Sequence, residues 1–208
     1  MRQVPVRRAA PYVGCMTTTP AFLDSARPDV PDIVAPRGVT PFHLPGRPVR
    51  GRLVRLGPLA DALLTRHDNH PVVTALSGQA MALAAALATA LKYRGSFSLH
   101  FKGDGPVPVL LADCTEAGAL RGYARADAGR LAALLATEPA PSAAGLLGAG
   151  YLAFTVDQGA DIPRHQGIVA IEGESLADMA LHYFETSEQI ECTVRLACGR
   201  TDAAAGEG

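Results

Sequence analysis

A long segment of small and apolar residues, 71–93, constrains the fold of this chain more than any other feature. It reads PVVTALSGQAMALAAALATALKY, and its first charged residue is Lys92. Its length of about 20 residues would just span a bilayer, but polar residues such as Thr74, Ser77 and Gln79 interrupt it. A helix that is apolar on all sides is also what a protein buries between other layers. We therefore predict a buried core helix and no membrane span.

Segments of alternating polarity on both sides of this helix predict β-strands. Near 97–101, for example, Phe97, Leu99 and Phe101 point to one side of the chain while the residues between them are polar. The predicted strands lie at 49–57, 97–101, 151–158, 167–173 and 190–198. With the apolar helix they predict an α+β fold, in which largely antiparallel sheets enclose a buried helix.

Turns and caps separate these elements. The run Gly103, Asp104, Gly105, Pro106 favours a tight hairpin turn. Three glycines within 145–150 resemble a dinucleotide loop, but they precede a predicted strand and open no helix, so we interpret them as a turn. Ser175 and Asp178 have the spacing of a capping box, which predicts a helix over 175–189 packed outside the sheets.

Proline density divides the chain. Nine of the sixteen prolines precede Val49, so we predict a disordered leader over 1–46, a folded core over 47–199 and a disordered tail over 200–208. The start of the chain is Arg-rich but lacks the apolar core of a signal peptide, which argues against export. Met1 and Met16 both remain candidate starts.

Composition argues against nucleic-acid binding. The net charge is −1, tryptophan is absent and aromatic residues make up only 5% of the chain. The cysteines are Cys15, Cys114, Cys192 and Cys198, and no two have the short spacing of a structural zinc site. Cys192 and Cys198 would lie about 20 Å apart on one strand, too far for a disulfide. We expect reduced thiols and no metal site.

Catalytic motifs are absent from the sequence. It contains no nucleophile elbow, zinc-protease helix or phosphate-binding loop. His67 and His70 have a ligand-like spacing without a third ligand, and a helix end explains them better. His100 and Asp104 flank one turn and could form an acid–base pair, but such a pair is more often solvated surface. We predict no catalytic residue and no enzyme.

A series of short motifs resembles the heat shock protein 33 family, the redox-regulated holdase chaperones of the bacterial cytoplasm. No single motif is specific, but their order and spacing match the family from about Val49 to Gly199. The motifs are VRGRLVRL (49–56), GDGPV (103–107), LRGYARAD (120–127), LLGAGYLAFTVDQG (146–159), HQGIVAIEGESLA (165–177) and YFETSEQI (183–190). The sequence departs from the family at His165, where the family usually has Tyr, and at Glu191-Cys192, where it usually has Pro-Thr.

The resemblance implies an ATP-independent chaperone that binds unfolding client proteins, with possible homodimers. The family carries a C-terminal zinc module whose cysteines have C-x-C and C-x-x-C spacing, and oxidation releases the zinc and activates the protein. This sequence contains neither pair, so the resemblance implies the core domain without its redox switch and without a zinc ligand. The alternative is a protein-interaction module that keeps the fold without chaperone activity.

A client-binding edge is expected near the C-terminal end of the core. The predicted strand 190–198 has one apolar face, and an unpaired apolar edge invites strand addition by another chain. That face consists of Ile190, Cys192, Val194, Leu196 and Cys198.

Overall fold

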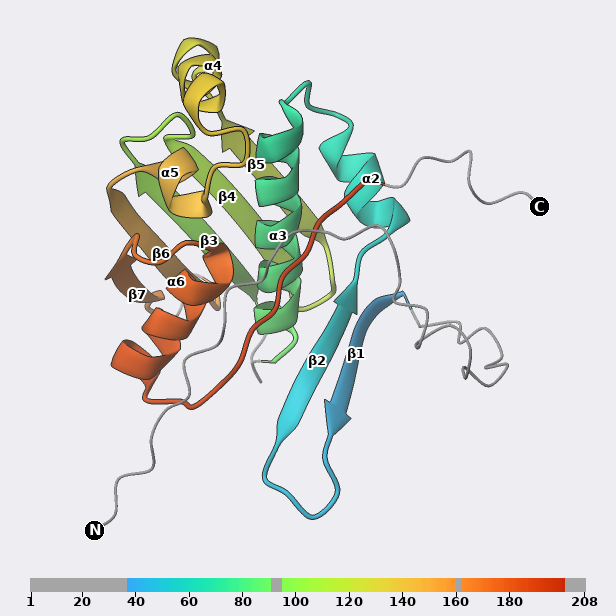
Figure 1. Cartoon of the computed structure of the whole chain (residues 1–208). Helices are drawn as coiled ribbons and strands as arrows, with labels where there is room; N and C mark the ends of the chain where they lie inside the picture. Colours follow the sequence, from blue (N-terminus) through green and yellow to red (C-terminus); the bar gives the residue numbers. More distant parts are fainter. Residues whose placement is uncertain (1–36, 91–94, 160–161, 201–208) are drawn as a thin grey trace, which may run out of the picture. The chain divides into compact units, whose positions relative to one another are not determined.

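Helix α3 (Pro71–Ala88) is the central element of the structure, a computed structural model that describes residues 37–90, 95–159 and 162–200 (Figure 1). These residues belong to the unit Pro36–Gly208. Pro71 occupies the first helical turn, where its missing amide costs nothing, and the His70 side chain accepts a hydrogen bond from the Val72 amide. The predicted helix-end role of His70 is therefore confirmed.

The described part of the chain contains one helix long and apolar enough to cross a membrane, and it is α3. More than half of it is buried within the protein, which is typical of a core helix. Its apolar side chains lie in the same core as those of the sheet. The prediction of a buried core helix is confirmed, with Ala88 as its last helical residue.

One antiparallel sheet packs against α3. Its order is β5-β4-β3-β6-β7, and every neighbouring pair is antiparallel. The strands are β3 (Ser96–Gly103), β4 (Val109–Thr115), β5 (Leu120–Arg125), β6 (Gly150–Asp157) and β7 (His165–Ala170). The central position belongs to β3, whose Phe97, Leu99 and Phe101 are buried as their alternation predicts.

Helix α6 (Leu176–Tyr183) covers the β6–β7 end of the same face. The capping box of Ser175 and Asp178 is present, as predicted. The Tyr183 ring stacks on Phe154 with 3.9 Å between centroids, and a Cβ on Gly167 would come within 2.3 Å of that ring. A glycine in β7 therefore makes room for the tyrosine. A single π-helical turn, η1 (Phe184–Glu188), continues the helix.

Two short helices lie in the connection between β5 and β6. Helix α4 (Ala128–Thr137) is capped by the Asp127 side chain, and helix α5 (Ala143–Leu147) by the Ser142 hydroxyl. Gly148 ends α5 and Gly150 begins β6, so the predicted turn into a strand is confirmed for 148–150, whereas Gly145 lies within the helix.

A separate two-stranded sheet precedes α3. Strands β1 (Gly38–His43) and β2 (Arg50–Arg55) form an antiparallel hairpin, and α2 (Pro58–Leu64) follows it. The prediction of a disordered leader up to residue 46 is therefore wrong for β1. Although Gly38 and Pro41 have low β-propensity, this strand pairs with β2 and packs Val39 against the core. The rest of the predicted leader, 1–36, lies outside the described residues.

The predicted strand 190–198 does not form. This segment is extended but pairs with no strand of the described residues, and it crosses α3 on the side away from the five-stranded sheet (Figure 1). The alternation of its side chains nevertheless holds, since Val194, Leu196 and Cys198 are half-buried and the residues between them are exposed. The predicted apolar face is therefore present over 194–198, and the prediction is wrong for Ile190 and Cys192, which are exposed.

Candidate functional site

The segment 189–200 is the first candidate surface, because it lies over the most apolar helix of the chain without a backbone ladder. We call it the C-terminal strap. Val194 and Leu196 pack against the core cluster. A Cβ on Gly78 of α3 would come within 2.4 Å of Cys198 Sγ, so this glycine lets the strap approach the helix.

Backbone hydrogen bonds do not hold the strap. Among the described residues, its bonds to another element's backbone are those from the Gln189 and Ile190 amides to the Phe184 carbonyl, the second at 2.9 Å. The chain enters the strap through Gln189, which has a left-handed backbone (φ 54°). Ile190 is 49% exposed and Cys192 is exposed, so neither follows the half-buried side of the strap. The strap therefore offers unpaired backbone and two exposed apolar side chains to solvent.

The thiols of the described residues are not activated. Cys114, Cys192 and Cys198 are all free, as predicted, and Cys15 lies outside the described residues. Burial raises the pKa of Cys114 and Cys198. Cys192 is exposed overall, but partial burial of its thiol also raises its pKa, and the negative charge of Glu185 adds to that shift. A thiol with a raised pKa is mostly protonated at neutral pH and reacts slowly with oxidants.

The β1–β2 hairpin is a second exposed apolar surface. The register pairs Thr40 with Leu53 and Phe42 with Gly51, and the bond from the Leu44 amide to the Val49 carbonyl (2.9 Å) extends it. These pairs share one face, and the alternate pairs turn Val39 and Val54 toward the core. Exposed fractions on the outer face are 48% for Phe42, 46% for Leu44, 45% for Val49 and 47% for Leu53.

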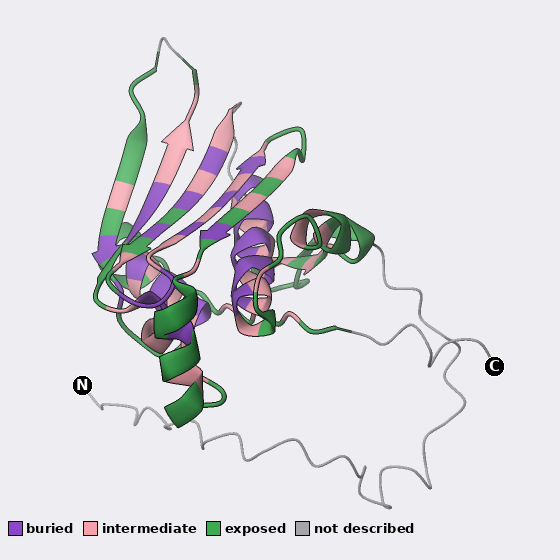
Figure 2. Cartoon of the chain, turned by 90° about the horizontal axis from the view of Figure 1, so that it is seen from above, coloured by how far each residue is buried: buried purple, intermediate pink, exposed green. Residues whose placement is uncertain are grey.

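A third surface is the face of the five-stranded sheet turned away from α3. Figure 2 shows the alternation of buried and exposed residues along these strands, with the helices on the other face. The register aligns one row across all five strands, with His100 at its centre and exposed Tyr123 and Ile168 at its ends. The next row is polar and contains the ion pair of Arg121 with Asp113. Apolar and polar rows alternate on this face. Its exposed apolar surface is therefore less continuous than that of the hairpin.

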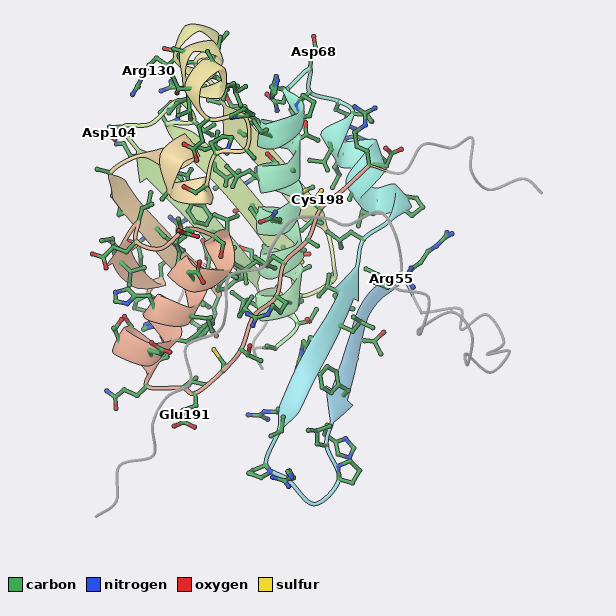
Figure 3. The ribbon with its side chains drawn as sticks, viewed as in Figure 1. Arg55, Asp68, Asp104, Arg130, Glu191 and Cys198 are labelled. Carbon is green, nitrogen blue, oxygen red and sulfur yellow. The ribbon has the colours of Figure 1, made fainter. Side chains whose placement is uncertain are left out.

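The turn 103–106 has a structural role. It joins β3 to β4 over five residues, 104–108, so the hairpin is confirmed but its turn is longer than predicted. The Asp104 amide donates to the Ala149 carbonyl at 2.9 Å, and Asp104 Oδ1 accepts from the Ala149 amide at 2.8 Å. The Arg130 side chain donates to the Asp104 carbonyl, and Figure 3 shows both residues at the α4 end of the sheet.

Glycines let this turn dock on the loop before β6. A Cβ on Gly103 would lie 2.0 Å from the Leu147 carbonyl oxygen, and one on Gly105 would lie 2.4 Å from the Leu147 carbonyl carbon. The Gly105 amide donates to that same carbonyl at 2.8 Å. The motifs GDGPV and LLGAG, about forty residues apart in sequence, are thus two halves of one backbone contact.

No catalytic or metal-binding cluster occurs among residues 37–90, 95–159 and 162–200. No group of three potential metal ligands comes together in these ranges. The Asp104 carboxylate is engaged with the Ala149 amide, and His100 is exposed on β3, so the described bonds give no support to an acid–base pair. His67 lies edge-on to Tyr123 with ring centroids 6.2 Å apart, which is a packing contact.

Sequence reasoning missed the hairpin surface. Phe42 and Leu44 stand two residues apart, as do Gly51 and Leu53, with Pro45-Gly46 between them. This alternation about a turn was a usable signal, but the surrounding prolines outweighed it. Pro41 is tolerated in β1 because it occupies a strand of a two-stranded sheet, where each strand has one unpaired edge.

Comparison with known proteins places these surfaces in context. The family model described as Hsp33 protein matches residues 38–207. The 33 kDa chaperonin of Caulobacter vibrioides is 45% identical over 168 residues, which make up 81% of this chain and 56% of that protein. The 33 kDa chaperonin of Pseudomonas fluorescens is 36% identical over 141 residues, 68% of this chain and 45% of that protein.

The fold has a solved counterpart. The crystal structure of the 33 kDa chaperonin from Thermotoga maritima, a heat shock protein 33 homologue, aligns with a TM-score of 0.61 at 22% identity. The alignment covers 76% of this chain and 57% of that one. This chain therefore spans about half the length of the curated relatives that it matches.

Proposed function

This chain belongs to the Hsp33 family, which is not a family of enzymes, and from that membership we propose that it is an ATP-independent holdase. It binds unfolding proteins in the bacterial cytoplasm and prevents their aggregation. Its partners are client proteins and a second copy of itself, with no nucleic acid and no membrane among them.

The observation that carries this proposal is the C-terminal strap. The strap is an extended segment that lies on an apolar helix and forms no backbone ladder. In this respect it resembles the unpaired edge strand of a sheet. An unfolding client offers extended backbone and apolar side chains, which are the two groups that strand addition uses. The client-binding residues remain those predicted: Ile190, Cys192, Val194, Leu196 and Cys198.

Client binding by this chain needs no oxidant. The sequence contains no C-x-C or C-x-x-C pair, and the three described thiols have raised pKa values caused first by burial. Thiols of that kind make poor redox sensors. We therefore propose activity in the reduced protein and no zinc requirement for this stretch of chain.

Light scattering of a thermally unfolding client enzyme tests the holdase function. With this chain present under reducing conditions, aggregation is expected to be suppressed, and peroxide treatment is expected to change the suppression little. Absence of suppression in both conditions would overturn the proposal. Suppression seen only after peroxide would overturn the oxidant-independent part of it.

The strap is tested by removing its amide donors while its half-buried side chains stay. Thr193→Pro with Arg195→Pro takes two exposed positions, where proline fits an extended backbone. Suppression of aggregation is expected to fall at least ~5-fold in potency, since each lost hydrogen bond contributes about 0.5–1.5 kcal/mol. The matched control, Thr193→Ala with Arg195→Ala, keeps both donors and is expected to retain activity.

A specific interaction module is the second candidate, favoured by the apolar outer face of the hairpin. Such a module binds one partner and leaves the aggregation of unrelated clients unchanged. Testing two unrelated client enzymes separates the two functions, because a holdase suppresses the aggregation of both.

A further inference from the structure

Strand β7 forms one edge of the five-stranded sheet, and its outer side has no partner among the described residues (Figure 1). No backbone hydrogen bond of that part of the chain joins β7 to any strand other than β6. The six residues of β7, HQGIVA, include no proline, lysine, arginine or carboxylate. Charged side chains and prolines are what usually protect an edge strand against pairing with another chain. The outer side of β7 is therefore a candidate site for strand addition.

The ladder between β6 and β7 determines which backbone groups face outward. The Ile171 amide, just after β7, donates to the Gly150 carbonyl at 3.0 Å. In an antiparallel ladder the direction of these groups alternates, so Val169 and Gly167 also turn their amides and carbonyls toward β6. The residues between them turn theirs outward, and their side chains are exposed as well. These residues are Gln166, Ile168 and Ala170.

The opposite edge of the sheet, β5, is protected by charge. Arg121 and Arg125 are both exposed on this strand, two residues on either side of Tyr123. A strand added there would lie beside both guanidinium groups, which is the arrangement that discourages edge pairing in natural sheets. Of the two edges of the five-stranded sheet, β7 is therefore the one open to another chain.

An apolar side chain lies at the centre of the open edge. Ile168 is 57% exposed, the largest exposed fraction among the large apolar side chains that the structure describes. Its partner across the ladder, Ala153, is buried. An incoming strand would place one side chain directly opposite Ile168, and the pair would gain burial only if that side chain were apolar.

The two ends of β7 differ in charge. Beyond Ala170 the chain carries Glu172 and Glu174, which are both exposed. Neither glutamate takes part in an ion pair of the described residues. At the other end of the strand, Arg164 is already paired with Asp157 at 2.7 Å. The charge left uncompensated is therefore negative, and it lies at the carboxyl end of β7.

We propose that the outer edge of β7 binds an extended peptide segment that has an apolar side chain opposite Ile168 and basic residues at its amino end. Every strand pair of this sheet is antiparallel, and an added strand continues that pattern. The amino end of an antiparallel partner lies beside the carboxyl end of β7, where Glu172 and Glu174 follow. The occupant is a basic, partly apolar stretch of an unfolded protein, and this site is separate from the C-terminal strap.

Fluorescence anisotropy of a labelled peptide added to the full chain tests the site. The probe has two lysines at its amino end, followed by alternating threonine and valine. One matched probe replaces the lysines by glutamates, and a second moves the lysines to the carboxyl end. Both are expected to bind at least ~5-fold more weakly than the first, because charge complementarity sets the direction of the added strand. Equal binding of the three probes, or no binding of the first, would overturn the proposal.

Removal of the outward amides tests the backbone contact. Gln166→Pro with Ala170→Pro deletes two outward donors and leaves the ladder to β6, since proline is tolerated on an edge strand. Binding of the first probe is expected to weaken at least ~5-fold, since two hydrogen bonds are lost. The matched control is Gln166→Ala, because position 170 is already alanine. It keeps both donors, loses only the side-chain bond to Thr155, and is expected to bind like the wild type.

A charge reversal that leaves β7 intact keeps the proposal testable if the proline variant fails to fold. Glu172→Lys with Glu174→Lys changes two exposed residues outside the strand and is expected to reverse the preference, so that the glutamate probe binds better than the lysine probe. The strap variant Thr193→Pro with Arg195→Pro is expected to bind the first probe like the wild type, so this site and the strap fail independently. An unchanged preference, undiminished binding by a folded proline variant, or loss of binding in the strap variant would each overturn the site.

Discussion

The two layers that flank α3 are built in different ways. On one side, five strands are joined by continuous antiparallel ladders, and their inward side chains are buried. On the other side lie a two-stranded hairpin and the C-terminal strap, which pairs with no strand among the described residues and leaves apolar side chains in solvent. Both layers contact the same helix, but only the first is held by a hydrogen-bonded sheet.

This difference assigns stability to the five-stranded sheet and client binding to the second layer, within one domain. Elements with few buried contacts and solvent-exposed backbone open at low free energy, whereas central strands open only with global unfolding. A surface that receives unfolding proteins must present apolar groups and free backbone without unfolding its own domain. The ladder of β3, β4 and β6 permits that, because it keeps α3 in place whatever the second layer does.

Truncating one phenylalanine in each layer should give the largest difference in unfolding free energy between the two layers. Phe101→Ala removes a fully buried ring from β3 and is expected to cost about 3–5 kcal/mol of unfolding free energy, since a cavity remains. Phe42→Ala removes a ring that is 48% exposed on the hairpin and should cost under about 1 kcal/mol. Urea denaturation measures both, and equal losses would mean that the hairpin belongs to the cooperative core.

A methyl group added to the turn at 103–106 should have the next largest effect. Gly105→Ala places a Cβ 2.4 Å from backbone atoms that a helix and a strand hold in position, so about 1–3 kcal/mol is expected to be lost. Gly129→Ala, in α4, meets only Asp127 Oδ1 at 3.6 Å and should stabilise by up to about 1 kcal/mol. Thermal unfolding compares them, and a neutral Gly105→Ala would contradict the close docking on Leu147.

Alkaline pH should weaken the region where the sheet meets η1. Burial, then the hydrogen bond to Glu188 and its charge, raises the pKa of Tyr183 above its ordinary value. In the unfolded chain the hydroxyl ionises near pH 10, so stability present below that pH is lost as the pH rises further. The thermal midpoint should therefore fall between about pH 9 and about pH 11, and less so in Tyr183→Phe. Equal declines in both proteins would exclude this residue as the cause.

The smallest effect on stability is expected from a change beneath the strap. Gly78→Ala puts a methyl group 2.4 Å from Cys198 Sγ, and the strap can move away because no backbone ladder fixes it. The unfolding free energy should change by less than about 1 kcal/mol, helped by the better helix propensity of alanine. The reaction of Cys198 with a thiol reagent should accelerate, measured in a Cys192→Ser background. Unchanged reactivity together with a large loss of stability would mean that the strap is fixed.

Most of the first layer could be predicted from the sequence. The 2-residue alternation of β3 is strong because that strand buries one whole face, and α3 is recognisable because it is apolar on nearly all sides. Ser175 and Asp178 fixed the start of α6 in the same way, through local hydrogen bonds that need no tertiary information. The family motifs added the order of these elements.

The second layer could not be predicted in the same way, because its structure depends on partners distant in sequence. Alternation at 190–198 indicated a strand, but whether an extended segment joins a ladder depends on which edge lies beside it. The prolines before Val49 indicated disorder, and they concealed β1, which pairs with β2 along one edge and tolerates Pro41 in a two-stranded sheet. The contact of GDGPV with LLGAG could not be predicted from the sequence either, because each motif alone indicates only an ordinary turn.

Hydrogen–deuterium exchange of the reduced chain, with and without an unfolding client, tests most directly whether the strap is the client-binding layer over a stable core. We expect the amides of residues 191–200 to exchange rapidly in the free protein and to become protected when client is present. Amides of β3 and β6 should exchange slowly in both samples. Slow exchange of the strap in the free protein, or no protection by client, would contradict the account.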